Sequence, residues 1–119
     1  MKRRISKSQA AQADTIQVSD KSVSLIGFAL KSKQLVNGYE AVCKSVIKNK
    51  IEFVLVKSDI SDRSLRKLTS FLQQYQISVY KTLPQTDWHK LWGMERWKII
   101  GFHKGKLGRT ILQNFNSGV

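Results

Sequence analysis

The chain has 119 residues, which is enough for one domain with one core and too few for two. Its 21 Lys and Arg residues outnumber its 8 Asp and Glu residues and give a formal net charge of +13. We therefore expect a polyanionic partner, nucleic acid ahead of an acidic membrane surface. A single cysteine, Cys43, excludes an internal disulfide and, with only two histidines, argues against a structural zinc site. We expect no metal and no cofactor.

Residues 1–20 are polar and basic, and we expect them to form a flexible arm ahead of a globular domain at 21–119. This segment lacks the apolar middle region of a secretory signal. Its basic, serine-bearing composition leaves an organelle-targeting segment open, although Asp14 counts against it. No apolar run approaches the roughly 18 residues that span a bilayer, so no membrane segment is expected.

The first expected helix covers residues 21–32, with Ser19 or Asp20 as its N-cap. Apolar residues lie on more than one of its faces, which predicts a largely buried helix. The apolar pair at 35 and 36 allows a short edge strand.

A second helix over 38–48 has the most regular pattern in the chain. Its apolar stripe consists of Tyr39, Val42, Cys43, Val46 and Ile47. Another side carries charged residues at every fourth position: Glu40, Lys44 and Lys48. Cys43 belongs to the apolar stripe, which favours a packed thiol over a nucleophile.

Strands and helices then alternate, with connections of two to six residues. The expected elements are a strand at 52–56, a helix that begins after Asp59 or Ser61 and ends near 75, a strand at 77–80, a helix at 86–92, a strand at 97–102 and a helix at 104–115. This alternation predicts the α/β class: a three-layer α/β/α sandwich with a small four-stranded mixed sheet and helices on both faces.

The residues that catalysis would need are not arranged in a known pattern. His89 and His103 lie in different expected elements, and the spacing of Gly105 and Gly108 fits neither a P-loop nor a dinucleotide motif. We therefore expect a protein that is not an enzyme.

The start of the helix at 38–48 has two interpretations. Glu40 and Lys44 fit a surface ion pair worth a few tenths of a kcal/mol. Alternatively, Gly38 permits close backbone approach, and the free N–H groups beside it suit a phosphate. Lys44 and Lys48 then add positive charge, while Glu40 accepts hydrogen bonds from the amino groups of bases.

Three tryptophans fall within ten residues and alternate with cations. The cluster consists of Trp88, Lys90, Trp92, Arg96, Trp97 and Lys98. These rings either stack on unpaired bases or pack in the core, and we expect at least one to be core. Residues 93–96 are expected to form a loop.

The order of these elements, with LVNGYEAVCKSVIKNKIEFVLVKSDISDRSLRKL followed by a strand, a helix, WGMER and a last strand, resembles the kink-turn-binding ribosomal-protein superfamily. This group includes the archaeal "L seven Ae" and eukaryotic "L thirty e" ribosomal proteins, and the nearest type is the small bacterial YlxQ-like protein. The resemblance covers residues 22 to 115.

The helix motif carries the resemblance residue by residue. Gly38 and Lys44 match the glycine and lysine of the family motif. Glu40 and Ala41 stand where asparagine and glutamate are usual. Lys33 is the cation nearest to the place of the family's preceding glycine–lysine pair.

The resemblance implies a non-catalytic, ribosome-associated RNA-binding protein that recognises a kink-turn or a similar bulged or internally looped RNA. The helix side of that site would consist of Lys33, Asn37, Gly38, Tyr39, Glu40, Lys44 and Lys48. The loop side would consist of Gly93, Met94 and Arg96, with Met94 as apolar cover for bulged nucleotides and Arg96 as a phosphate contact.

The expected partners are ribosomal or other structured RNA and ribosomal proteins, for a cytoplasmic protein that is monomeric when free. A less specific nucleic-acid-binding or chaperone-like protein, a protein–protein adaptor and a small ribonuclease are the alternatives.

Overall fold

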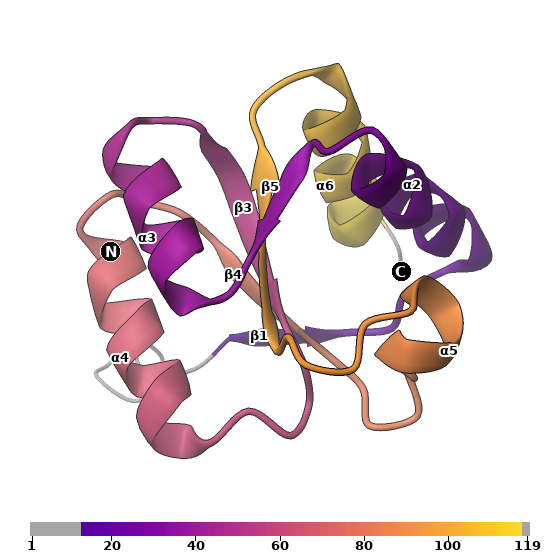
Figure 1. Cartoon of the computed structure of the whole chain (residues 1–119), viewed down its shortest axis with the longest axis horizontal. Coiled ribbons are helices and arrows are strands. Elements are labelled where there is room, and N and C mark those ends of the chain that lie inside the picture. The colour runs from indigo at the N-terminus through magenta and orange to yellow at the C-terminus, as the bar shows by residue number, and fades with distance from the viewer. Residues whose placement is uncertain (1–12, 118–119) are drawn as a thin grey trace.

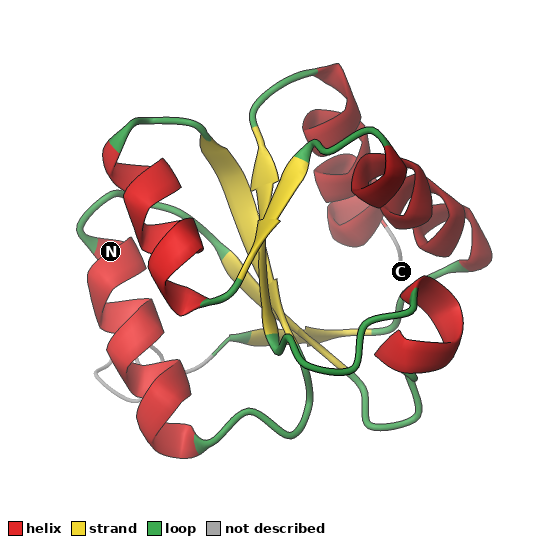
Figure 2. Ribbon diagram, viewed as in Figure 1, coloured by secondary structure: helices red, strands yellow, loops and turns green. Residues whose placement is uncertain are grey.

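A computed structural model describes residues 13–117, which form one five-stranded sheet and five helices (Figure 1). The strands are β1 (Asp14–Ile16), β2 (Leu35–Asn37), β3 (Ile51–Val56), β4 (Val79–Thr82) and β5 (Ile99–His103). The helices are α2 (Asp20–Lys31), α3 (Tyr39–Ile47), α4 (Asp62–Gln73), α5 (Trp88–Trp92) and α6 (Lys106–Ser117). Helices cover both faces of the sheet, as the sequence predicts (Figure 2).

The strand order is β1-β4-β3-β5-β2, and the sheet is mixed. Strand β4 pairs in parallel with β1 and β3, whereas β5 pairs antiparallel with β3 and β2. The predicted edge strand β2 is confirmed, but the expected number of four strands is wrong because β1 adds a fifth. The polar stretch that forms β1 belongs to the expected arm. An edge strand needs hydrogen bonds on one side only, so its backbone can join the sheet without a hydrophobic pattern.

Most of the expected arm, residues 1–12, lies outside the described residues. Ile16, the last residue of β1, and Val18, which follows the strand, are partly buried and pack against the core. Deleting residues 1–17 should therefore lower the free energy of unfolding by about 1–2 kcal/mol more than deleting residues 1–12, because only the longer deletion removes β1 and Ile16. Denaturant unfolding of both truncated proteins measures this difference. Equal stabilities would contradict a structural role for β1.

Serine caps fix the starts of two helices as predicted. The Ser19 side chain accepts a hydrogen bond from Ser22 N (3.1 Å) at α2, and Ser61 accepts one from Ser64 N (3.1 Å) at α4. The expectation for the faces of α2 is wrong in part, because Phe28 is 58% exposed.

Two strands begin two residues later than expected. Strand β4 begins after Ile77, whose N–H donates to Leu72 O and closes the end of α4 instead. Strand β5 begins after Trp97 and Lys98, which extend the preceding loop.

Helices α3 and α4 cover one face of the sheet. Along β3, Val54 and Val56 face these two helices, and a bulge between Ile51 and Phe53 brings Ile51 to the same side. The absence of a side chain at Gly101 lets α3 approach β5: a β-carbon there would lie 3.1 Å from Cδ1 of Ile51 and 3.2 Å from Cγ2 of Val42.

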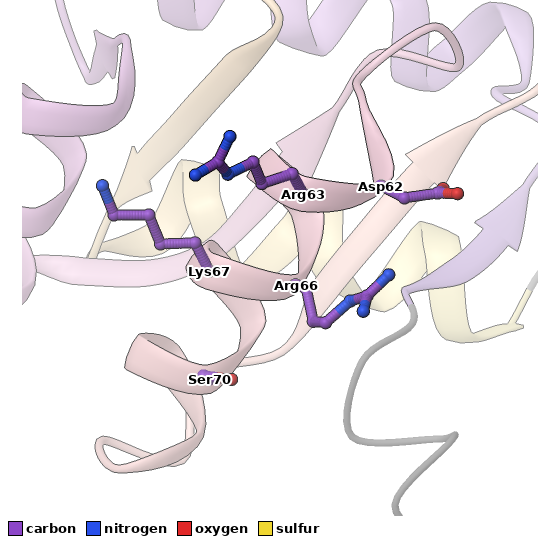
Figure 3. A pocket seen from close by; sticks show the side chains of 5 residues that line it. All are labelled: Asp62, Arg63, Arg66, Lys67 and Ser70. Atoms are coloured by element: carbon purple, nitrogen blue, oxygen red, sulfur yellow. The ribbon is translucent and has the colours of Figure 1, made fainter.

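The outward side of α4 is polar and basic. A hollow on this side is lined, among the described residues, by Asp62, Arg63, Arg66, Lys67 and Ser70 (Figure 3). The apolar side of the same helix packs on the sheet through Leu65, Leu68 and Leu72, which confirms the predicted stripe except for Tyr75, which is 43% exposed.

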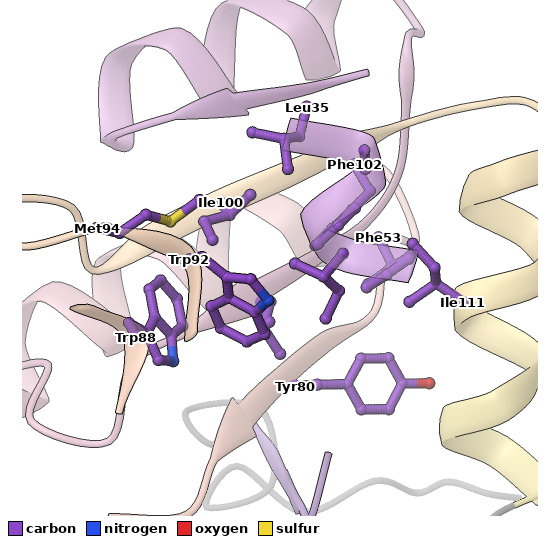
Figure 4. Packing of buried hydrophobic residues seen from close by; sticks show 12 residues of the cluster. Leu35, Phe53, Tyr80, Trp88, Trp92, Met94, Ile100, Phe102 and Ile111 are labelled. Carbon is purple, nitrogen blue, oxygen red and sulfur yellow. The ribbon is translucent and has the colours of Figure 1, made fainter. Parts of the chain in front are cut away.

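Helices α2, α5 and α6 cover the opposite face over an aromatic core (Figure 4). The rings of Phe53 and Phe102 stack with centroids 4.5 Å apart. Trp88 is fully buried, and its Nε1–H donates to the hydroxyl of Thr82 (3.0 Å). Trp92 is 6% exposed and donates to Val23 O (3.0 Å). Two of the three tryptophans are therefore core residues.

No helix within residues 13–117 is long and apolar enough to cross a membrane.

Candidate functional site

The start of α3 has no side-chain cap. Its N-cap is Gly38, with φ 92° and ψ 157°, a backbone conformation that only glycine adopts readily. No side chain caps this end, in contrast to α2 and α4, whose N-cap serines each accept a backbone N–H. The first N–H groups of α3 therefore lack a side-chain cap at the positive end of the helix dipole, a geometry that suits an anion.

The structure joins the start of α3 to the loop at 93–98 (Figure 1). Gly38 N–H donates to Ile99 O (2.8 Å), and the ring of Trp97 lies directly against Gly38. A β-carbon at position 38 would lie 2.9 Å from Cζ3 of Trp97, so glycine is needed here for space as well as for φ. The helix and loop sides of the predicted site are thus adjacent, although they lie almost 60 positions apart in the chain.

The exposed aromatic ring of this loop belongs to Trp97, which is 41% exposed. The guanidinium of Arg96 lies 5.8 Å from the centroid of that ring, within range of a cation–π contact. A flat apolar surface and a cation therefore stand together beside the open N–H groups of α3.

Met94 does not lie at this surface. A left-handed turn at Gly93, with φ 69°, ends α5 and directs the next residue back toward the core. Met94 N–H donates to Trp88 O (3.3 Å), and its side chain is 4% exposed within the aromatic core (Figure 4). The expectation that Met94 covers nucleotides is therefore at odds with its burial, and Trp97 presents the apolar surface instead.

The spacing of the tryptophans partly indicated that Trp97 would be the exposed ring. Trp88 and Trp92 are four residues apart on one helix, a spacing that places both on one buried face, whereas Trp97 lies outside that pattern.

The charged row on α3 is exposed. Glu40 and Lys44 both face solvent, and within residues 13–117 they form no ion pair with each other. The surface ion pair that the spacing allows is therefore absent from the structure, and Lys44 is available to a ligand. Lys48 is the C-cap at the far end, about 15 Å from Gly38 at 1.5 Å per residue.

Tyr39 connects α3 to α4. The Nζ atom of Lys67 lies 4.9 Å from the centroid of the Tyr39 ring. Burial raises the pKa of Tyr39, and its neighbour Cys43 raises it further. Burial also raises the pKa of the Cys43 thiol, although its hydrogen bond to Tyr39 opposes this shift. The net shift favours the neutral form of the Cys43 thiol, which is in line with a packed thiol and not with a nucleophile.

Asn37 and Lys33 lie at opposite ends of β2. Asn37 is paired with Ile100 in the sheet, directly before Gly38, and its Oδ1 atom is buried without a hydrogen-bond partner among the described residues. Such an atom costs about 1–3 kcal/mol if it stays unpaired. Lys33 is exposed in a left-handed turn before β2, so the strand separates it from the start of α3.

The acidic groups around the loop have partners of their own. Glu95 lies 3.4 Å from His89 Nδ1, and Asp59 lies 3.5 Å from Lys98 Nζ. Arg96 is exposed and is not held by a carboxylate within residues 13–117. In the same part of the chain, no group of three or more His, Cys, Asp and Glu side chains is placed to hold a metal ion.

The chain is similar to known proteins in part of its sequence and in its fold. The model of the "Ribosomal protein L7Ae/L30e/S12e/Gadd45 family" matches residues 20–87, which include α2, α3 and α4. No curated protein matches the chain.

Two solved structures are similar to this one. "The structure of a protein with unknown function from Bacillus halodurans C" has a TM-score of 0.73 and 26% sequence identity, with 82% of this chain and 99% of that chain covered. A "Giardia lamblia 15.5kD RNA binding protein" has a TM-score of 0.65 and 11% identity, with 85% and 92% covered, a likeness that shows the fold alone.

The family model spans more than half of the chain and includes the whole of α3 with its N-cap, in line with the resemblance carried by Gly38 and Lys44. The chain belongs to the ribosomal protein L7Ae/L30e/S12e/Gadd45 family.

Proposed function

We propose that this protein binds structured RNA without catalysing a reaction, and that it recognises a kink-turn or a similar bulged or internally looped RNA. The contact between Gly38 and Trp97 carries the proposal, because it unites an uncapped helix start with an exposed aromatic ring. Family membership supports an RNA-binding role.

The two sides of the site suit different parts of such an RNA. The open N–H groups of α3 and the Lys44 ammonium attract backbone phosphates. An unstacked base, which a bulge exposes and a regular duplex does not, can stack on the ring of Trp97. Arg96, beside that ring, neutralises the phosphate of the same nucleotide.

Acceptor groups at the helix start supply discrimination between bases. The carboxylate of Glu40 is exposed in the first turn of α3 and accepts hydrogen bonds from base amino groups. It also repels phosphates, so an RNA that offers no donor at this point binds less well.

The ring of Trp97 supplies the test. Trp97→Ala should weaken binding to a kink-turn RNA by about 1–3 kcal/mol, the range for the loss of one base–aromatic stack, and should weaken binding to a plain duplex much less. Titration of both RNAs at fixed salt measures the two losses.

Tyr75→Ala is the matched control. Tyr75 is 43% exposed, close to the 41% of Trp97, and it follows the C-terminal end of α4, outside the proposed site. It should leave both affinities unchanged. Equal losses on kink-turn and duplex RNA in Trp97→Ala would instead indicate the less specific nucleic-acid-binding protein.

We further propose that the protein acts in the cytoplasm as a monomer that associates with the ribosome through ribosomal RNA and neighbouring ribosomal proteins. Family membership and the net charge of +13 support this setting. Cosedimentation with ribosomal particles at low salt, and release by nuclease treatment, would support it. Sedimentation at the free-protein position under all conditions would contradict it.

A further inference from the structure

The basic side of α4 is a second charged surface beside the proposed site. Arg63, Arg66 and Lys67 are exposed, and no ion pair holds any of them to a carboxylate within residues 13–117. Together with Asp62 and Ser70 they line the hollow on the outward side of the helix (Figure 3). Three cations face one carboxylate, so this surface has a positive local charge.

The surface is continuous with the start of α3. Lys67 belongs to the hollow and also lies over the ring of Tyr39, the first residue of α3. In Figure 3, Arg63 and Lys67 extend to the same side of α4, while Asp62 extends away from both. A strand that leaves the helix start of α3 past Tyr39 therefore meets Lys67 first and Arg63 next, without passing the carboxylate.

We propose that α4 binds the phosphate backbone of the duplex stem that adjoins the bulged part of the RNA. Its main contacts are Arg63, on the side of Lys67, and Arg66, which extends to the other side of the helix in Figure 3. This inference rests on the proposed function. All lining side chains end in a polar or charged group, and three of the five are cations, so the surface suits an anionic backbone better than a hydrophobic partner helix. The guanidinium fork of arginine suits phosphate oxygens, and such contacts position an RNA without reading its sequence.

The two arginines can be removed without damage to the helix. Both side chains are exposed, and Arg63, a cation in the first turn, opposes the helix dipole, so Arg63→Gln/Arg66→Gln should fold normally. Coincident denaturant unfolding curves for the variant and the unchanged protein check this point.

The experiment compares two RNAs that share one kink-turn. In the first, both stems extend for a full helical turn; in the second, they are trimmed to the few pairs that hold the bulge. On the long-stem RNA, Arg63→Gln/Arg66→Gln should weaken binding about tenfold to a hundredfold and lower the log–log salt slope by about two units. On the short-stem RNA, its affinity should match that of the unchanged protein.

Helix α6 offers a matched control on the other face of the sheet. Lys106 and Arg109 have the same spacing as Arg63 and Arg66 and are also exposed, and Lys106→Gln/Arg109→Gln removes the same charge. This control should bind both RNAs like the unchanged protein. Equal losses of affinity in the α4 and α6 double variants would overturn the inference, because the loss would then depend only on the net charge of the protein.

Trp97→Ala, measured in the same series, separates this inference from the proposed function. If Trp97→Ala weakens binding to both RNAs while the α4 pair has no effect on either, the α3 site stands and the stem contact is wrong. If Arg63→Gln/Arg66→Gln weakens binding while Trp97→Ala does not, the proposed function fails. The inference that one RNA runs from the start of α3 to α4 then fails as well. An equal loss for the α4 pair on long and short stems would also overturn the stem contact.

Discussion

Gly38→Ala should lower the free energy of unfolding by about 2–4 kcal/mol, because it combines backbone strain with a steric clash. At φ 92° and ψ 157°, any residue with a β-carbon is strained. The added methyl would also lie 2.9 Å from the Trp97 ring and must displace it. Affinity for kink-turn RNA should fall in the same variant, since the displaced ring no longer adjoins the helix start. Denaturant unfolding and RNA titration measure the two effects.

Two further variants separate strain from the clash. Gly93 also has a positive φ, 69°, but a β-carbon there meets no atom within 4 Å, so Gly93→Ala should cost only about 1 kcal/mol. In the double variant Gly38→Ala/Trp97→Ala, the clash is removed and the strain remains. Its destabilisation should be smaller than the sum of the two single variants, whereas strict additivity would show that the ring is not in contact with position 38.

Trp88→Ala should cost about 3–5 kcal/mol of unfolding free energy, the usual range for removing a large buried ring. Trp88 is fully buried, packs edge-on against Trp92 with centroids 5.8 Å apart, and donates to the hydroxyl of Thr82, which is 1% exposed. The substitution therefore leaves both a cavity and an unpaired buried hydroxyl.

Two related variants should destabilise the protein less than Trp88→Ala. Trp88→Phe keeps most of the ring volume but loses the Nε1–H, so it should fall between the alanine variant and the unchanged protein. Trp97→Ala, at the surface, should change stability by less than about 1 kcal/mol. Similar losses for Trp88→Ala and Trp97→Ala would show that the division into one surface ring and one core ring is wrong.

Regular hydrophobic spacing made the main helices predictable from sequence. In α4, Leu65, Leu68 and Leu72 repeat with the helical period and are all buried. Serine caps then fixed the first residues of α2 and α4. Periodicity could not reveal β1, because that strand is held by backbone pairing with β4, and its side chains are mostly exposed.

The candidate site was predictable at its helix side and less so in its loop. Gly38 and Lys44 belong to a motif with fixed helical spacing, so their relation to each other follows from the sequence. The orientation of a loop residue depends on backbone turns and on contacts made by other elements. The left-handed turn at Gly93 sends Met94 inward, and the contact with Gly38 holds Trp97 at the surface. Likewise, the residues between Lys33 and the start of α3 form the extended strand β2 because they pair with β5, and this strand separates Lys33 from the helix.

The buried position of Met94 has a consequence for the speed of recognition. The loop at 93–98 is attached to the core on one side of the sheet through Met94 and to α3 on the other side through Trp97 and the Gly38–Ile99 hydrogen bond. A movement of this loop therefore requires a core side chain to leave its packing. We expect such a movement to be as slow as sub-global opening, and slower than the motion of a free surface loop. For the proposed RNA ligand we therefore expect a preformed surface, with an association rate set by charge-guided diffusion and not by rearrangement of the loop.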